Sequence, residues 1–435
     1  MSNTTAVVIG GGFAGVTAAR ELSTHYDQIL ILEGSDRLGG RAYSSTFEAA
    51  GKVVELGGAW VSTRFNRWLT REIQRYSLPL SESHAPEPIF RWGTGRNGYA
   101  DGFPVQGADI YELERVVWEI GRDARRIDPT VPRSEQDLAD LDISITDYLT
   151  RLRAPESVRR FFYGWAAVGS GAHPHEWSAL TALSWIAAMD NQLYGWFAAV
   201  SEKVDAGSGA LLHAILADSN AEVRLNSPVG SVDQTGERVV VTLRDGAAVE
   251  ADAVIVATAY NAWGTIDFTP PLNAAKQRAQ SAPHPGRMFK FFAVVDRAPE
   301  GLYAIGYDQD LICVGYEGAV RGGHLVVCFC GTPTVVDAHR LGDVEKALEP
   351  IIPGVRVLAT IGHSWEDDVW AHGTWMNSIP GVLSADHSAL QALEGRVAFA
   401  TADIANAWPG WIDGAIESAV STVAALTASD EKVSR

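Results

Sequence analysis

A glycine-rich loop near the start of the chain restricts the possible folds more than any other feature of the sequence. Gly10, Gly12 and Gly15 have the spacing G-x-G-x-x-G, and they lie between an apolar run at residues 6–9 and a helical pattern of apolar residues that ends at Leu22. In a strand–loop–helix unit such glycines allow a tight turn, a close approach of pyrophosphate and close packing of the helix on the strand. The first turn of the helix also offers free N–H groups to phosphates.

A second apolar run, at residues 29–32, ends at Glu33. A carboxylate at the end of the second strand is placed to accept a hydrogen bond from a ribose hydroxyl. Strand, helix, second strand and terminal acid are therefore all present, and together they predict a dinucleotide-binding unit. This pattern by itself suits either FAD or NAD.

Length and charge set limits on the class of protein. A chain of 435 residues is too long for one compact core, which predicts two lobes. The net charge of −18 makes nucleic acids and anionic membrane surfaces poor partners. No signal peptide and no run of 18 apolar residues is visible, so we expect a cytoplasmic protein with no membrane partner. The sequence leaves a homodimer open.

Cysteine and histidine residues give no sign of a metal site. Cys313, Cys328 and Cys330 cannot build a disulfide framework, and the last two alternate along an apolar run, so we expect buried thiols. His173 and His175 flank a proline with no third ligand nearby, which favours a turn. We therefore predict no bound metal.

The distribution of helical and strand patterns predicts two discontinuous domains. The block from about residue 68 to about 222 is mainly helical and poor in strands, whereas strands return on its C-terminal side. We predict a nucleotide-binding domain made of residues 1–75, 200–282 and 395–435, and a substrate-binding domain made of residues 76–199 and 283–394.

Four separated stretches of the chain share one pattern of motifs. They read VVIGGGFAG with ILEGSDRLGGRAYS, then VELGGAWVS, then LNSPVGSVDQ with VIVATA, and finally FATADIANAWPGWIDGAIESA. Their order and spacing resemble the flavin-dependent amine oxidases, the monoamine oxidase-like group of FAD proteins. Within that resemblance, Gly39-Gly40-Arg41 followed by Gly57-Gly58 is typical of this FAD group and not of NAD dehydrogenases. The resemblance implies FAD and a two-lobed α/β fold, in which a Rossmann-like FAD-binding domain joins a substrate domain of mixed sheet and helices.

The resemblance also assigns residues to the cofactor. Paired glycines let the backbone approach a flat ligand closely, and the planar guanidinium of Arg41 can bond phosphate or ribityl oxygens. The C-terminal helix would direct its first N–H groups at the electron-rich edge of the flavin. The implied cofactor-binding residues are Gly10, Gly12, Gly15, Glu33, Gly40, Arg41, Gly57, Gly58, Val229, Asp403, Trp411 and Ile412.

Four residues are implied in the chemistry. Lys290 lies in the otherwise apolar run RMFKFFAVV, where a buried lysine needs a partner, and it matches the family's lysine that holds a water near flavin N5. Trp375 and Trp411 match the two aromatic walls of the family's substrate cage. Trp60 matches a third aromatic residue that faces the substrate cavity. Such a slot can hold an amine against ring faces and exclude water.

These residues predict an FAD-dependent oxidase that uses a small-molecule amine and O2. The segment AHGTW has no cysteine before Trp375, so the resemblance implies non-covalent FAD. Within the family the chain is most similar to bacterial members that oxidise 6-hydroxynicotine, but Val168 lies where those have an asparagine beside the pyridine. The amine is therefore left open. A dehydrogenase with another electron acceptor and a non-catalytic flavin-binding protein remain as alternatives.

Overall fold

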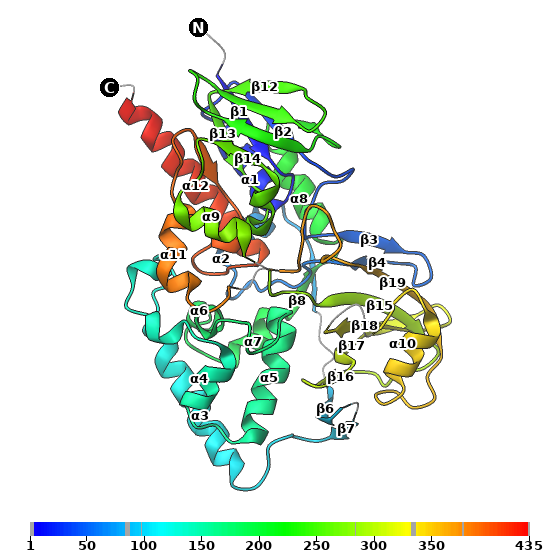
Figure 1. Cartoon of the computed structure of the whole chain (residues 1–435). Coiled ribbons are helices and arrows are strands. Elements are labelled where there is room, and N and C mark those ends of the chain that lie inside the picture. Colours follow the sequence, from blue (N-terminus) through cyan, green and yellow to red (C-terminus); the bar gives the residue numbers. More distant parts are fainter. Residues whose placement is uncertain are drawn as a thin grey trace.

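The structure is a computed structural model that describes residues 4–82, 88–96, 98–282, 284–331, 336–375 and 378–433. Figure 1 shows three groups of elements. Strands and the C-terminal helix lie at the top, a block of helices at the lower left, and a second large sheet at the lower right.

A five-stranded parallel sheet carries the glycine-rich loop. Its strands come from both ends and from the middle of the chain, in the order β20 (Val397–Phe399), β13 (Ala253–Val256), β1 (Thr5–Ile9), β2 (Gln28–Leu32) and β9 (Glu222–Arg224). The central strands are continuous apolar runs, as expected for parallel strands that are covered on both faces.

Helices cover one face of this sheet and a second sheet covers the other. Ala6 and Val8 of β1 pack with residues of α1 (Phe13–Leu22), α2 (Arg67–Arg75), α8 (Ser208–Ala217) and α12 (Ile412–Val433). Val7 and Ile9 face the opposite way. They pack against a sheet of order β12 (Ala248–Ala251), β11 (Val239–Leu243), β10 (Val229–Asp233) and β14 (Asp267–Thr269), next to α9 (Ala274–Ser281) and α11 (Val382–Gln391).

A seven-stranded sheet forms the other large sheet of the molecule. Its order is β19 (Val357–His363), β15 (Phe289–Val295), β18 (Gly323–Cys330), β17 (Leu311–Val320), β16 (Leu302–Ile305), β6 (Ile89–Gly95) and β7 (Gly98–Asp101). Every residue of β15 is buried, because the strand lies between β18 and β19 and packs on both faces. One face is covered by α10 (Leu341–Leu348).

The chain between residues 68 and 222 is mainly helical, but it also contributes strands to two sheets. Its main run of helices comprises α3 (Asp109–Ala124), α4 (Ile145–Arg151), α5 (Glu156–Ser170), α6 (Ala179–Ala188) and α7 (Gly195–Ala199). The sequence predicts few strands between residues 68 and 222, and the strands that the structure has there lie on either side of the main run of helices. There β6 and β7 join the seven-stranded sheet, and β5 (Leu80–Glu82) pairs with β8 (Glu202–Val204). β5, β7 and β8 have only three or four residues, and β5, β6 and β8 pair with distant segments. The local periodicity of the sequence therefore does not indicate these strands.

A small two-stranded sheet packs against the seven-stranded sheet. β3 (Ser44–Phe47) and β4 (Lys52–Glu55) form a hairpin that follows the first βαβ unit.

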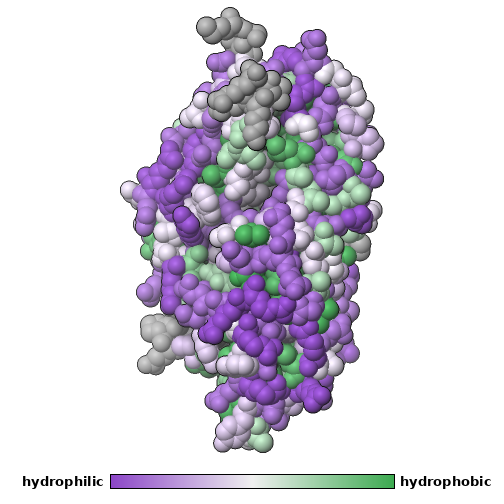
Figure 2. All heavy atoms as spheres, turned by 90° about the vertical axis from the view of Figure 1, so that its left-hand side faces the viewer, coloured by the Kyte–Doolittle hydropathy of each residue, from purple (hydrophilic) through white to green (hydrophobic). Residues whose placement is uncertain are grey.

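No helix in the described part of the chain is long and apolar enough to cross a membrane. In the face shown in Figure 2 hydrophilic residues predominate and hydrophobic ones are scattered. The boundaries of the two predicted domains stay a prediction.

Candidate active site

One cavity of about 690 Å³ connects the glycine-rich loop with the predicted substrate residues. Its walls include Trp60, Lys290, Trp375 and Trp411 from four separate parts of the chain. The other predicted residues in its lining are Gly10, Gly12, Glu33, Gly40, Arg41, Gly57, Gly58, Val229 and Ile412. Gly15 and Asp403 lie outside the lining but support residues within it.

The glycine loop has the geometry of a phosphate site. Gly10 has φ +106°, and a Cβ atom on Gly15 would fall 1.9 Å from the carbonyl oxygen of Gly10. Both positions therefore require glycine. Gly12 is the N-cap of α1 and has no side chain, and the first turn of α1 carries no acidic residue. The N–H groups at this helix end thus face the cavity with a favourable dipole for an anion.

Glu33 is fixed by the backbone around the loop. One of its carboxylate oxygens accepts from the Gly11 N–H at 2.6 Å and the other accepts from the Ser35 N–H at 2.8 Å. Because a carboxylate has about four acceptor positions, the side chain can still accept from a hydroxyl in the cavity.

Arg41 is held at the cavity wall by an acid behind it. Its guanidinium donates to Asp403 at 2.5 Å and to the carbonyl of Thr374 at 3.3 Å. The other oxygen of Asp403 accepts from the Tyr260 N–H at 3.0 Å. Thr258 and Thr374 also line the cavity, and their buried hydroxyls have no hydrogen-bond partner. This part of the cavity is therefore equipped to bond a polar ligand.

Lys290 is buried with one direct polar partner and several rings. Its ammonium donates to the carbonyl of Gly57 at 2.9 Å and lies 4.8 Å from the centroid of the Trp60 ring. The pKa of Lys290 is lowered from 10.5 to about 7, mainly by burial and also by the charge of Lys203, while Glu55 and Glu317 act in the opposite direction. Its amine is therefore close to balance between protonated and neutral forms near neutral pH.

The tryptophans are held by packing and by hydrogen bonds to the backbone. Trp375 donates from its ring N–H to the carbonyl of Gly169 at 2.6 Å. Trp411 directly precedes α12 and packs edge to face against Trp408, Trp185 and Trp196, at centroid distances of 5.0, 6.0 and 6.1 Å. Such contacts fix the ring positions, since aromatic pairs prefer these geometries.

Comparison with known proteins identifies the family. A family model for flavin containing amine oxidoreductases matches residues 13–427. The chain belongs to this family. Its members contain a flavin and act on amines, so this protein is an oxidoreductase of amines with a flavin cofactor.

Relatives and solved structures agree with this assignment. (S)-6-hydroxynicotine oxidase of Paenarthrobacter nicotinovorans is 33% identical over 97% of this chain and 99% of its own. Pseudooxynicotine dehydrogenase of a Pseudomonas species is 34% identical, over 95% of this chain and 84% of its own. Cyclohexylamine oxidase from Brevibacterium oxydans has a TM-score of 0.85 at 19% identity, over 99% of this chain and 100% of its own. A triple mutant of putrescine oxidase has a TM-score of 0.85 at 23% identity, over 98% and 99%. The predicted amine oxidase fold is therefore confirmed.

The residues of this amine oxidoreductase suit a flavin dinucleotide. The helix end at Gly12, the guanidinium of Arg41 and the two unpartnered threonine hydroxyls supply donors along the cavity. At the other end, Gly57 allows the backbone to lie against Arg41, because a Cβ atom there would be 2.0 Å from the Arg41 carbonyl oxygen. These donors and close approaches match a long ligand whose pyrophosphate lies at the glycine loop and whose flat ring lies at the far end of the cavity.

Sequence reasoning missed several charged residues of the site. Lys203 and Glu317 form an ion pair at 2.6 Å, and Glu317 lines the cavity. Asp413 is buried directly after the cavity residue Ile412, and burial raises the pKa of its carboxyl to about 7. Each of these looks like an ordinary polar residue of a strand or helix. Only the fold brings them to the site.

Other residues singled out in the sequence have structural places. His173 and His175 stack on each other at 5.5 Å on the exposed surface. Among the described residues, no group of three His, Cys, Asp or Glu residues could hold a metal ion. The three cysteines, Cys313, Cys328 and Cys330, are buried. Val168 lines the cavity from α5, where an asparagine would add a hydrogen-bonding group.

Proposed function

We propose that this protein is an oxidase that binds FAD non-covalently and oxidises an amine, with 6-hydroxynicotine as the first candidate. When bound, FAD supplies the redox chemistry: N5 takes a hydride from the carbon next to the amine nitrogen, and O2 receives the electrons to give H2O2. The imine product is then hydrolysed by water. One observation carries the proposal. The cavity that begins at the glycine loop also contains a buried lysine, Lys290, and three tryptophans.

The chain's own residues bind and orient the reactants. For the cofactor we propose Gly10, Gly12, Gly15, Glu33, Gly40, Arg41, Gly57, Gly58, Val229, Asp403, Trp411 and Ile412. Cys313 lines the cavity, but burial raises its pKa to about 12, so its thiol stays protonated and unreactive. This supports non-covalent binding.

Trp375, Trp411 and Trp60 hold the amine and keep water away from the reacting carbon. An aromatic enclosure of this kind lowers the local polarity and favours the unprotonated amine, which is the form that can release a hydride. Lys290 contacts Trp60 and the Gly57 carbonyl, so it holds a proton-donating group at the border between the cofactor and substrate parts of the cavity.

The named substrates of the relatives support a nicotine-related amine. Two relatives are named for 6-hydroxynicotine and pseudooxynicotine, and a third is nicotine dehydrogenase of Pseudomonas putida, at 29% identity. Other cyclic amines and primary amines remain as alternatives, because Val168 offers no hydrogen bond to a pyridine ring.

Anaerobic reduction tests the proposal. The purified yellow protein is mixed with (S)-6-hydroxynicotine without oxygen, and the visible flavin band is followed. Rapid bleaching by this amine supports the first candidate, and bleaching only by another amine keeps the mechanism and changes the substrate. A protein without flavin colour, or one that no amine bleaches, contradicts the proposal.

A dehydrogenase is the second candidate, because two of the similar relatives are named dehydrogenases. The same reduced protein is divided between buffer that contains O2 and anaerobic buffer that contains an artificial acceptor. Reoxidation at least as fast with O2 supports the oxidase. Reoxidation only by the artificial acceptor supports the dehydrogenase.

A further inference from the structure

The cavity continues past Lys290 into a chamber on the seven-stranded sheet. Its lining there includes Val168 of α5, Leu302 and Tyr303 of β16, Cys313 and Gly315 of β17, and Val327 and Phe329 of β18. Most of these side chains are apolar. Glu317 of β17 lines the same chamber and brings a charge to it.

The other carboxylates of the cavity lining lie at its opposite end. Glu33 and Asp36 follow β2, and Asp367 and Asp368 follow β19. The loop after β19 lies against the loop after β2, because a Cβ atom on Gly34 would be 3.0 Å from the ring of Trp370. Glu317 is thus the one acidic residue of the described cavity lining on the chamber side of Lys290.

Glu317 is held in place by Lys203 of β8. Its two carboxylate oxygens accept from the Lys203 ammonium at 2.7 and 2.6 Å, and the two side chains are only 18% and 19% exposed. The same ammonium lies 5.1 Å from the centroid of the Trp60 ring, whose other cationic neighbour is Lys290 at 4.8 Å. Glu317 therefore lies about one aromatic side chain away from Lys290.

The chemistry of this carboxylate selects the group that can face it. An ionised carboxylate only accepts hydrogen bonds, and Lys203 leaves part of its acceptor capacity unused. An ammonium group on the ligand would be repelled by the charge of Lys203, and by Lys290 whenever that lysine is protonated. A carbonyl oxygen or a pyridine nitrogen would present lone pairs to lone pairs. A neutral O–H or N–H group can donate to the carboxylate, carries no positive charge for the lysines to repel, and directs a hydrogen atom, not a lone pair, at Glu317.

Two further polar groups of the chamber are engaged with each other. The hydroxyl of Tyr303 and the thiol of Cys313 form a hydrogen bond, and burial raises the pKa of both groups, so both remain uncharged. Of these three side chains, Glu317 is therefore the one that can accept a hydrogen bond from a ligand in the chamber.

We propose that Glu317, held by Lys203, forms a subsite for a neutral hydrogen-bond donor on the substrate, at the end remote from the oxidised carbon. The inference rests on the proposed amine oxidation and narrows its substrate class. It assigns to this protein amines that carry a hydroxyl or ring N–H, such as 6-hydroxynicotine, over otherwise equal amines that lack it, such as nicotine. It also disfavours diamines such as putrescine.

The test compares (S)-6-hydroxynicotine with (S)-nicotine, which lacks the hydroxyl, on the flavin-loaded protein without oxygen. The dissociation constant and the limiting rate of flavin bleaching are measured separately. A hydrogen bond to a carboxylate should make the hydroxylated amine bind at least about tenfold more tightly. In Glu317→Gln this ratio should fall toward one, because the remaining oxygen is the acceptor for Lys203 and the amide NH2, which is a donor, is left to face the ligand.

Two variants guard against misfolding and check the charge argument. The double variant Lys203→Met with Glu317→Met replaces the whole pair by apolar side chains and leaves no unpaired charge, so it should fold and bind both amines equally. Lys203→Met alone leaves the carboxylate uncompensated and should strengthen binding of putrescine relative to the parent protein.

A second readout does not depend on turnover. Calorimetric titration with 2-hydroxypyridine and with pyridine, neither of which is an amine substrate, should show tighter binding of the hydroxylated ring, and Glu317→Gln should abolish the difference. If this holds while no amine bleaches the flavin, the subsite stands and the proposed oxidation fails. If 6-hydroxynicotine bleaches the flavin but has no advantage over nicotine, or keeps its advantage in both Glu317 variants, the subsite is refuted.

Discussion

The protein holds Lys290 close to balance between its charged and neutral forms, because β15 is buried on both faces and Lys203 adds a like charge nearby. A lysine with a pKa of about 7 can give or take a proton near neutral pH, whereas an exposed lysine cannot. Its contacts with Gly57 and Trp60 place this amine between the proposed cofactor and substrate parts of the cavity.

Replacing Lys290 by methionine should separate the two half-reactions. We expect Lys290→Met to retain FAD and to be reduced by the amine at a rate close to that of the parent, while its reaction with O2 slows at least about tenfold, since a proton donor worth one to a few kcal/mol is lost. Stopped-flow absorbance measures both steps, and the ratio of flavin to protein checks cofactor retention. Equal losses in both half-reactions would show that the lysine has another role.

Asp413 should make stability depend on pH with an unusual sign. Burial raises the pKa of Asp413 from 3.8 to about 7, so the folded state holds a proton that the unfolded chain has already released. The stabilisation is complete below the unfolded pKa and is lost as the pH rises through about 7. Asp413→Asn keeps an oxygen for the Leu69 N–H and cannot ionise.

Urea unfolding from about pH 4 to about pH 8 measures this effect. The variant should be as stable as the parent in acid and more stable at neutral pH. Asp140→Asn serves as the control, because its hydrogen bond with Arg126 holds the pKa of Asp140 below its usual value of 3.8, so this carboxyl stays ionised over the whole range and the variant should lose nearly the same stability at every pH. Parallel pH profiles for the parent and Asp413→Asn would contradict the argument.

Single residues also show what the sequence could predict about the site. Lys290 was predictable because a lysine inside an apolar run conflicts with its surroundings. The glycines were predictable because their spacing is tied to one loop geometry. Lys203 and Glu317 were not, since they lie 114 positions apart on strands that look half-exposed, and nothing local pairs them.

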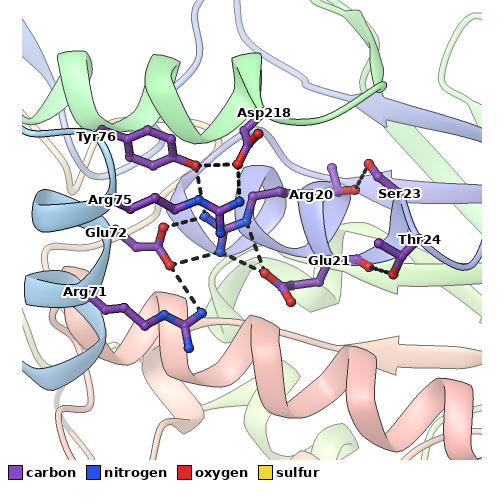
Figure 3. Close-up of polar contacts among 10 residues, drawn as sticks. Arg20, Glu21, Ser23, Thr24, Arg71, Glu72, Arg75, Tyr76 and Asp218 are labelled. Atoms are coloured by element: carbon purple, nitrogen blue, oxygen red, sulfur yellow. Dashed lines mark hydrogen bonds and ion pairs between the residues drawn. The ribbon is translucent and has the colours of Figure 1, made fainter.

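At the scale of elements, a buried ionic network joins three helices around the first βαβ unit. Figure 3 shows Arg20 of α1 between Glu72 of α2 and Asp218, which follows α8. Arg20 donates to Glu72 at 3.0 Å and to the hydroxyl of Tyr76 at 3.1 Å, and Tyr76 in turn donates to Asp218 at 3.1 Å. The network fixes α2 against the helix that begins at the glycine loop.

Breaking this network should cost much more than breaking a surface pair. Glu72 is fully buried and Arg20 is 5% exposed, so Glu72→Gln removes the buried counter-charge of Arg20. Glu21, at 2.8 Å, still pairs with the guanidinium, so the free energy of unfolding should fall by about 1.5–3 kcal/mol, the usual cost of a lost hydrogen bond to a charged group. Glu222→Gln removes the exposed partner of Arg224 and should cost about 0–1 kcal/mol. Chemical denaturation of both variants measures the difference, and similar costs would mean that the buried pair is not special.

The loop before α12 is held from within that helix. Glu417 is buried and accepts the N–H groups of Asn406 and Ala407 at 2.9 and 3.1 Å, while Arg133 donates to the carbonyl of Asn406. This loop leads to Trp411, so its backbone sets the place of a predicted cage wall.

Loosening this loop should affect amine binding more than flavin chemistry. Glu417→Gln puts an amide NH2 against one of the two N–H groups, and we expect the dissociation constant of the amine to rise about tenfold while the limiting reduction rate changes less. Rapid-mixing experiments give both values. If the binding defect persists undiminished when Trp411 is also replaced by alanine, Glu417 does not act through that ring.

Over the whole molecule, the elements that the sequence predicts are those whose contacts lie close together along the chain. The first βαβ unit is local, so its pattern predicts strands that the structure contains at residues 5–9 and 28–32. The strand at 89–95 pairs with the strand at 302–305. The sequence of either short segment does not indicate a partner so far away in the chain. The resemblance of four motifs supplied the fold that periodicity alone could not, and the two-domain boundaries stay a prediction.

The order of strands in the parallel sheet also has a consequence for biosynthesis. β20 and α12 follow β1 after most of the described chain, yet the sheet of β1 contains β20, and α1 packs with α12. The layers around the glycine loop are therefore incomplete until β20 and α12 have been synthesised. A nascent chain that still lacks these two elements exposes the apolar surface of β1 and α1 on which they pack.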